Sequence, residues 1–251
     1  MRRRGKWQGM WTIARLNWPF YVAALLALLV SIAGVFLVDA LWLRVSCALA
    51  GLGALYFLVF SLGVAHLVYD RSDLYRWAWL QRVLRGATPA QAILCHAGFD
   101  EASAFLKAHT LATAWTILDH YDAARMTEPS IHRARRWFPP APGTIATPQH
   151  TWPLEAGAAG LVLGLLAIHE FRGESERSAW FSEARRCAQK GGRVVLVEHL
   201  RNFANLLAFG PGFLHFHSRA SWQRCWQAAG LHLIEEFDIT PWVRVFVLSP
   251  A

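Results

Sequence analysis

Two residue types suited to binding a cofactor follow apolar segments that are expected to be strands. Gly98 follows the segment 92–96, and Asp119, about 20 residues further along, ends the segment 114–118. A glycine turn lets backbone amides approach a bound cofactor, and an acid at the end of the next strand accepts hydrogen bonds from ribose hydroxyls. The pair therefore predicts binding of a nucleoside-containing cofactor. A plain tight turn beside a surface aspartate has the same spacing and is the alternative.

Histidines and glutamates supply the candidate groups for moving a proton. The pKa of a free histidine lies near neutrality, which suits a general base. His169 and His199 rank highest because both come just past expected strand ends, although a histidine that only makes structural hydrogen bonds is the alternative for each. The remaining candidates are His120, His215 and His217, and Glu170 and Glu198 are expected as supporting acids.

Metal-binding patterns are weak in this sequence. The four cysteines form no CxxC pair, so they are expected to be reduced and structural. A zinc site made from His215, His217 and His232 would lack the thiol or carboxylate spacing typical of such sites. No metal is therefore expected.

The segments that position these residues alternate between strand-like and helix-like patterns. Strands are expected at 92–96, 114–118, 144–146, 160–166, 193–197, 231–237 and 243–248. Helices are expected at 77–84, 102–109, 128–136, 175–189 and 221–228, with the glycine pair at 191–192 ending the fourth. This alternation predicts an α/β fold with a mostly parallel sheet. Ligands of such sheets bind beyond the carboxyl ends of the strands, where Gly98, Asp119, His169 and Glu198 fall.

Two apolar segments near the start of the chain, 16–38 and 45–65, contain no Asp, Glu, Lys, Arg or His. About 20 apolar residues span the hydrocarbon core of a bilayer as a helix, so each segment is long enough to cross. A cleaved signal peptide is the alternative for the first, but a second apolar segment follows almost at once. The sequence predicts a basic N-terminus at 1–15, a transmembrane helical hairpin at 16–68 and a globular domain at 69–251.

The net charge of +8 is concentrated beside the hairpin. The flanking basic residues are Arg2, Arg3, Arg4, Lys6 and Arg15 before it, and Arg71, Arg76, Arg82 and Arg85 after it. By the positive-inside rule, both termini and the globular domain are expected on the cytoplasmic side of a bacterial-type inner membrane. Basic residues at this position favour membrane lipids as partners and give no reason to expect nucleic acid.

Several segments of the globular part resemble class I S-adenosylmethionine-dependent methyltransferases. The segment Ala184–His199, with the sequence ARRCAQKGGRVVLVEH, is similar to the family's helix that ends at K-P-G-G before a strand. The other similar segments are Trp152–Leu154, Gly160–Leu163, Leu166–Glu170 and the helix end Ala228–Leu231 before two final strands. The resemblance covers about 69–248 and implies a Rossmann-like sheet that follows the transmembrane hairpin.

The resemblance also implies S-adenosyl-L-methionine as cofactor and a set of residues around it. The implied cofactor-binding residues are His96, Gly98, Asp100, Asp119, His120, Gln149 and Ile168, and the catalytic candidates are His169 and His199. The chain departs from the family's D/E-x-G-x-G-x-G loop, because 95–101 contains one glycine and the first strand carries no acid. The family's adenine-contacting aspartate is replaced by Thr147–Gln149.

The predicted function is methyl transfer to a hydrophobic, membrane-resident small molecule such as a quinone, isoprenoid, pigment or lipid. A membrane anchor suits such an acceptor, and the insertion 201–219 is rich in Phe and Leu. One alternative is a catalytically inactive methyltransferase-fold subunit with a structural or assembly role in a membrane protein complex. Another is a domain that binds NAD or a nucleotide sugar, which fits Gly98 and Asp119 but not the final strand pair.

Overall fold

The computed structural model describes residues 5–110 and 113–250 and divides the chain into two units. Unit 1 comprises Met1–Ser72 and Phe203–Gly212, and unit 2 comprises Asp73–Asn202 and Phe213–Ala251. Part of the insertion thus groups with the N-terminal helices, which local sequence patterns did not predict. The basic residues Arg2, Arg3 and Arg4 lie outside the described residues.

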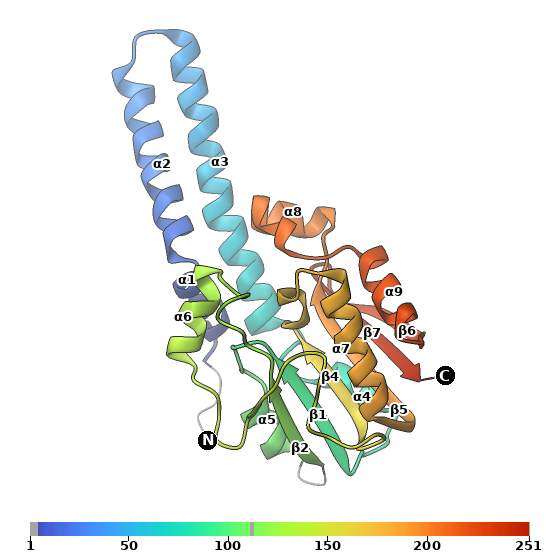
Figure 1. Cartoon of the computed structure of the whole chain (residues 1–251). Coiled ribbons are helices and arrows are strands. Elements are labelled where there is room, and N and C mark those ends of the chain that lie inside the picture. Colours follow the sequence, from blue (N-terminus) through green and yellow to red (C-terminus); the bar gives the residue numbers. More distant parts are fainter. Residues whose placement is uncertain (1–4, 111–112, 251) are drawn as a thin grey trace. The chain divides into compact units, whose positions relative to one another are not determined.

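Unit 1 is built on two long apolar helices, α2 (Trp18–Leu37) and α3 (Leu41–His66), which pack against each other as a hairpin (Figure 1). By length and composition, both helices are able to cross a membrane. They approach closely because small residues line their contact. A Cβ atom on Gly34 would lie 2.5 Å from Cys47 Sγ, and one on Gly51 would lie 3.1 Å from Ser31 Cβ.

A further helix, α1 (Gln8–Leu16), precedes the hairpin, and an aspartate that follows the hairpin in the chain binds its N-terminus. Asp70 lies in the helical turn η1 (Leu67–Arg71), and its carboxylate accepts from the amides of Gly9 at 2.7 Å and Met10 at 3.0 Å. These first-turn amides have no partner within α1, so the carboxylate caps the helix. The carboxylate of Asp70 therefore has its partners within unit 1.

The stretch of the insertion that belongs to unit 1 forms α8 (Phe203–Phe209), which packs on α3. The hydroxyl of Tyr56 donates to the carbonyl of Leu207 at 3.1 Å. Phe203 is 71% exposed, and Leu206 and Leu207 are also exposed. An apolar helix face therefore accompanies the hairpin.

Unit 2 contains a seven-stranded sheet in the order β3-β2-β1-β4-β5-β7-β6. The strands are β1 (Gln91–His96), β2 (Ala114–Asp119), β3 (Ile145–Ala146), β4 (Ala159–Leu165), β5 (Ala188–His199), β6 (Leu231–Thr240) and β7 (Val243–Pro250). The first five run parallel, and β7 is antiparallel to both β5 and β6. The predicted α/β, Rossmann-like sheet is confirmed.

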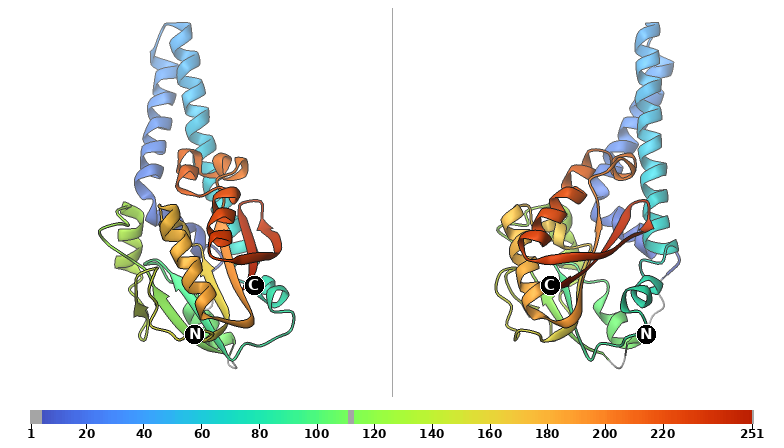
Figure 2. Two further views of the ribbon diagram at one scale, coloured as in Figure 1. Left: turned by 45° about the vertical axis from the view of Figure 1, so that its right-hand side comes forward. Right: turned by 90° about the vertical axis from the view of Figure 1, so that its right-hand side faces the viewer.

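Helices cover both faces of this sheet. They are α4 (Ala78–Leu84), α5 (Ser103–His109), α6 (Pro129–Trp137), α7 (Glu174–Cys187) and α9 (Arg219–Ala228), with the short turns η2 (Ile168–Glu170) and η3 (Gly210–His215). Figure 2 shows α4 and α5 on one face and α7 with α9 on the other. Strands buried on both faces must be apolar throughout, which explains the uninterrupted runs 161–163 in β4 and 194–197 in β5.

The glycine pair Gly191 and Gly192 lies inside β5, so the prediction that it ends the preceding helix is wrong. Helix α7 ends earlier, at Cys187, and Ala188 already pairs with Ala159 of β4. The pairing then shifts register, and Gly191 has a φ of +77°. A Cβ atom on Gly192 would lie 2.9 Å from the Gln189 carbonyl oxygen. The two glycines therefore allow the strand to bulge.

Candidate functional site

The strand order places a topological switch point between β1 and β4, because the chain continues from β1 to one side of the sheet and from β4 to the other. Ligands of open α/β sheets bind in the crevice beyond the carboxyl ends of the strands at such a point. β1 ends at His96 and β4 at Leu165. Two groups of polar residues follow the carboxyl ends of these strands and their neighbours: a turn around Gly98 and a cluster around His169.

The turn after β1 is fastened to the end of β2 by a buried carboxylate. Asp119 is 2% exposed, and its Oδ1 accepts from the amide of Gly98 at 3.0 Å and from that of Tyr121 at 3.1 Å. Its Oδ2 is paired with Arg135 of α6. The predicted pair Gly98 and Asp119 is therefore brought together. Asp119 already contacts two amides and Arg135, and Nδ1 of His96 lies 3.4 Å from its Oδ1.

The turn offers a backbone cradle, and a tyrosine covers it. Gly98 has a φ of +87°, which side chains other than glycine rarely adopt, and a Cβ atom there would lie 2.7 Å from Tyr121 Cδ2. Arg135 stacks on the same ring, with its Cζ 5.0 Å from the ring centre. An ionised carboxylate accepts about four hydrogen bonds. Asp119 therefore retains one acceptor position on Oδ2 for a ribose hydroxyl, which fits the nucleoside part of the implied cofactor once Tyr121 and Arg135 shift.

Two histidines beside this turn carry unpaired nitrogen atoms. His96 and His120 are both 3% exposed, and their Nε2 atoms have no hydrogen-bond partner in the part of the chain that the structure describes. His120 uses its Nδ1 to donate to the carbonyl of Thr147 at 2.9 Å. Burial lowers the pKa of both histidines, that of His120 to about 4. Buried polar atoms normally have partners, so these nitrogens are positions that a ligand would satisfy.

The other predicted cofactor residues differ in what surrounds them. Asp100 caps α5, with its Oδ1 accepting from the amides of Ala102 at 3.0 Å and Ser103 at 2.9 Å. Gln149 is partly exposed in the turn after β3. Ile168 is fully buried in η2 and contributes its backbone amide to the contacts of a second carboxylate, described next.

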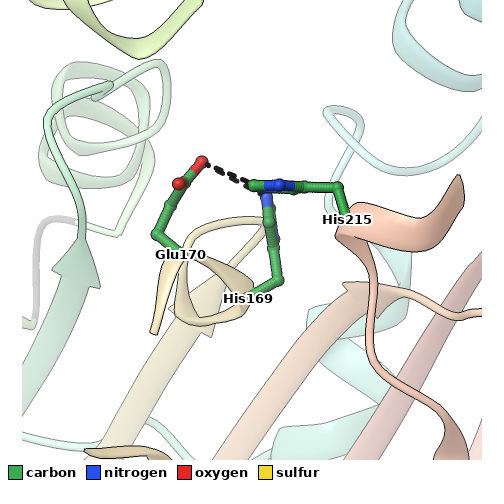
Figure 3. A group of neighbouring side chains, drawn as sticks. All are labelled: His169, Glu170 and His215. Carbon is green, nitrogen blue, oxygen red and sulfur yellow. Dashed lines mark ion pairs between the residues drawn. The ribbon is translucent and has the colours of Figure 1, made fainter. Parts of the chain in front are cut away.

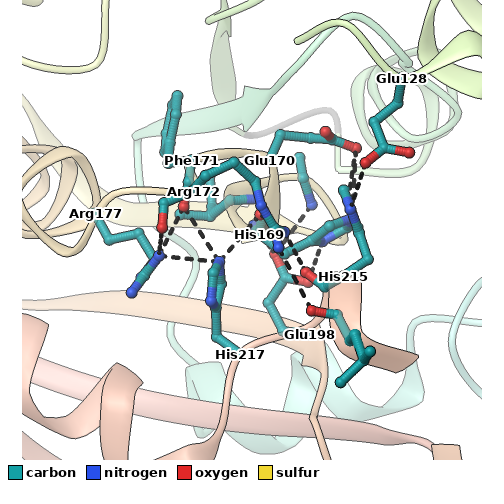
Figure 4. Close-up of polar contacts among 12 residues, drawn as sticks. Glu128, His169, Glu170, Phe171, Arg172, Arg177, Glu198, His215 and His217 are labelled. Atoms are coloured by element: carbon teal, nitrogen blue, oxygen red, sulfur yellow. Dashed lines mark hydrogen bonds and ion pairs between the residues drawn. The ribbon is translucent and has the colours of Figure 1, made fainter. Parts of the chain in front are cut away.

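Glu198, at the end of β5, is completely buried and organises the turn after β4 (Figure 4). Its Oε1 accepts from the amides of Ala167, Ile168 and His169 at 3.1, 2.8 and 3.2 Å. Its Oε2 lies 2.6 Å from His169 Nδ1. Because an ionised carboxylate only accepts, His169 donates from Nδ1. Burial alone lowers the pKa of His169, but the charge of Glu198 and this hydrogen bond raise it above its ordinary value.

His169, Glu170 and His215 form a compact cluster at this position (Figure 3). Glu170 Oε1 lies 3.6 Å from His169 Nε2 and 3.5 Å from His215 Nε2. The other ring nitrogen of His215, Nδ1, lies 3.1 Å from Oε1 of Glu128, the residue before α6. Two imidazoles therefore turn the same nitrogen toward one carboxylate oxygen.

Two arginines hold the backbone that carries this cluster. The guanidinium of Arg172 donates to the carbonyl of His169 at 3.3 Å and to that of His215. Arg201 donates from Nε to the carbonyl of Phe216 at 2.8 Å. The loop end that carries His215 is thus attached to the turn that carries His169.

The remaining candidate histidines lie in different surroundings. His199 Nδ1 contacts the carbonyl of Trp242 at 2.8 Å, where β5 meets β7. His217 Nε2 lies 3.0 Å from Arg177, and burial together with the charge of that arginine lowers the pKa of His217 to about 3. His232 is exposed on β6. The structure does not bring His215, His217 and His232 together.

From the sequence alone, Glu170 is expected only as a supporting acid, and no pattern points to Glu128. The local signal that was present is the pair His169-Glu170 directly after an apolar strand. No local pattern connects this pair with His215, which comes from the insertion after β5. The cluster is a product of the fold.

No protein-family model matches the chain. No curated protein sequence matches it significantly. Solved structures do match. An S-adenosylmethionine-dependent methyltransferase from Aquifex aeolicus is 10% identical, with a TM-score of 0.52 over 70% of this chain and 89% of its own.

Two further structures have the same TM-score of 0.52. One is a geranyl diphosphate C-methyltransferase from Streptomyces coelicolor A3(2), solved with Mg²⁺, geranyl diphosphate and S-adenosyl-L-homocysteine; it is 13% identical over 76% of this chain and 84% of its own. The other is the [4+2]-cyclase SpnF, which is 10% identical over 73% of this chain and 83% of its own. Unit 2 therefore has the class I methyltransferase fold. Because a cyclase also matches, the reaction must be argued from the site.

Proposed function

We propose that the chain transfers a methyl group from S-adenosyl-L-methionine to a hydrophobic small molecule in a membrane, such as a quinone, isoprenoid, pigment or lipid. The observation that carries this proposal is the link between Gly98 and Asp119 at the switch point of the methyltransferase sheet. A positive-φ glycine and a buried acid, joined at the ends of adjacent strands, form the cradle expected for a nucleoside.

The cofactor would be held mainly by the residues around this turn. Asp119 would accept from a ribose hydroxyl, and the unpaired nitrogens of His96 and His120 would bond polar atoms of the nucleoside. Asp100, Gln149 and Ile168, also assigned to the cofactor, would act through backbone and packing contacts. When bound, S-adenosyl-L-methionine supplies an electrophilic methyl group for in-line transfer to the acceptor.

His169 is the group we assign to the acceptor's proton. Glu198 fixes its ring through Nδ1, which leaves Nε2 directed toward the side of Glu170. A positioned imidazole is an effective proton acceptor when the nucleophile lies within hydrogen-bonding distance of it. His199 is the second assignment, although its Nδ1 already contacts the carbonyl of Trp242.

The membrane part of the proposal is supported by unit 1. Its two apolar helices are long enough to cross a bilayer, and α8 adds an exposed apolar face beside α3. We place the hairpin in a bacterial-type inner membrane, with both termini and unit 2 on the cytoplasmic side, because basic residues flank the hairpin. An enzyme anchored in this way meets an acceptor that does not leave the bilayer.

A catalytically inactive subunit of a membrane protein complex is the second candidate. The specific observation in its favour is that Tyr121 covers Gly98 and that Arg135 pairs with Asp119. A fold retained only for assembly has no need to keep the turn open to a cofactor.

The test is performed on the full chain in detergent or nanodiscs. S-adenosylhomocysteine is titrated calorimetrically, and label transfer from methyl-labelled S-adenosylmethionine to a membrane lipid extract is measured. We expect binding and lipid-soluble label, both lost in Asp119→Ala and retained in His232→Ala, which changes an exposed histidine of β6. A folded protein that binds no S-adenosylhomocysteine would contradict the proposal and favour the inactive subunit.

A further inference from the structure

His169, Glu170 and His215 each direct one electron-pair donor to a common point. Glu170 Oε1 is 3.6 Å from one Nε2 and 3.5 Å from the other, and the candidate ligand atoms all lie within 4.8 Å of one another (Figure 3). Both are ion-pair contacts, and both are longer than ordinary hydrogen bonds between nitrogen and oxygen, which are about 2.7–3.2 Å long. Two ligands of a tetrahedral zinc ion, each about 2.1 Å from it, lie about 3.4 Å apart. The observed spacing suits an ion between the groups.

The nitrogens that face away from this point are also arranged as in metal sites. His169 Nδ1 contacts Glu198, and His215 Nδ1 lies 3.1 Å from Glu128 (Figure 4). Metal-binding histidines nearly always donate their other ring N–H to a carboxylate, carbonyl or water, which fixes the ring and leaves the ligating nitrogen with its lone pair. Both histidines have this arrangement, on carboxylates from two different elements.

Charge and access favour a cation at the same point. The three carboxylates of Glu128, Glu170 and Glu198 surround the two imidazoles, while the nearby guanidinium of Arg172 is bonded to backbone carbonyls. The side chains of His169, Glu170 and His215 are 11, 12 and 21% exposed, so the cluster is sheltered but reachable from solvent. Three protein ligands leave at least one coordination position open.

We propose that His169, Glu170 and His215 bind a divalent transition-metal ion, with zinc as the first probe. Two imidazoles and one carboxylate suit zinc or ferrous iron, whereas magnesium prefers oxygen ligands and water. The open position would take an oxygen atom, from water or from a hydroxyl or carbonyl of a substrate. This site departs from the absence of metal expected from the sequence. It does not rest on the proposed methyl transfer. With the ion bound, the Nε2 lone pair of His169 holds the metal and cannot take the acceptor's proton, so His199 is then the remaining assignment for that proton.

The test uses the full chain in detergent after treatment with a chelator. Calorimetric titration with Zn²⁺ is expected to give one ion per chain, and Co²⁺ is expected to give the visible absorption of a protein-bound ion. Glu170→Gln, which keeps size and shape, and His215→Ala should each weaken Zn²⁺ binding at least ~10-fold, and Glu198→Gln should weaken it through the orientation of His169.

The matched control is His232→Ala, which removes an exposed histidine outside the cluster and should bind Zn²⁺ like the unaltered protein. Circular dichroism establishes that each variant is folded. A folded, unaltered protein that binds no Zn²⁺ or Co²⁺ would overturn the proposal. Equal Zn²⁺ binding by the unaltered protein and Glu170→Gln would also overturn it, because the ion would then lie elsewhere.

Discussion

The Gly98 turn and the His169 cluster both lie beyond the carboxyl ends of strands, yet they differ in how their polar groups are satisfied. At the turn, Asp119 bonds two amides and Arg135 of its own chain. In the cluster, the buried Glu198 also has partners, but Glu170 and two imidazole nitrogens converge at 3.6 and 3.5 Å, longer than ordinary hydrogen bonds. At Asp119 the chain itself supplies the partners, although Nε2 of His96 and of His120 beside it stay unpaired, whereas the cluster has the arrangement of a cation site. To reach Asp119, a ligand must displace Tyr121 and Arg135, whereas a cation binds among the groups of the cluster without displacing any of them.

The largest expected effect comes from removing the carboxylate that builds the cluster. Glu198→Ala leaves three backbone amides and His169 Nδ1 without their acceptor in a fully buried position. We expect the free energy of unfolding to fall by about 3–5 kcal/mol, measured by denaturant titration with tryptophan fluorescence. Asp119 accepts from two amides and Arg135, whereas Glu198 accepts from three amides and His169, so a smaller loss for Glu198→Ala than for Asp119→Ala would contradict this prediction.

Acid should weaken the turn region through His120. Its pKa in the folded protein is about 4, below the ordinary value, because burial disfavours the charged form. The contribution of neutral His120 to the free energy of unfolding is therefore fully present above pH ~6.5. It falls by about 2–3 kcal/mol as the pH drops toward 4. Thermal unfolding at a series of pH values measures this. In His120→Phe the slope between pH 6.5 and 5 should become shallower, and an unchanged slope would show that His120 does not cause it.

A pair of glycine substitutions separates backbone strain from the contact with Tyr121. Gly98 and Gly143 have φ values of +87° and +81°, but only a Cβ atom on Gly98 would meet another side chain, whereas Gly143 has open space. We expect Gly143→Ala to cost about 1 kcal/mol and Gly98→Ala about 2 kcal/mol or more. Only Gly98→Ala should reduce binding of S-adenosylhomocysteine in calorimetric titration. Equal effects on binding would remove the turn from the proposed cofactor site.

The smallest expected change in stability tests whether Arg135 competes with a bound cofactor for Asp119. Arg135→Ala removes a partly exposed partner of Asp119 and frees Oδ2, at a cost of about 1 kcal/mol in stability. If Arg135 occupies the position of a ribose hydroxyl, affinity for S-adenosylhomocysteine should rise several-fold in the same titration. Weaker binding would mean that the guanidinium helps to hold the nucleoside.

Local patterns predicted most of the elements because each pattern reflects burial of one short segment. The strands around 92–96, 114–118 and 193–197 are mostly apolar, and the structure confirms each of them. The predicted end of α7 is wrong, because a glycine pair can either stop a helix or permit a bulge in a strand. Pairing with β4 selects the bulge, and that pairing is not visible within the segment itself.

By itself, the sequence determined the two apolar helices, the alternation of strands and helices, and the placement of Gly98, Asp119, His169 and Glu198 at or just after the ends of strands. These features depend on neighbours along the chain, so composition and periodicity are enough to find them. Only the tertiary structure decided the partners of these residues. It paired Asp119 with Arg135 and directed backbone amides of η2 to the carboxylate of Glu198. It also brought His215 from the insertion to the pair His169-Glu170. Such contacts join segments far apart in the chain, and the path of the intervening loops, which no local pattern encodes, sets which side chains meet.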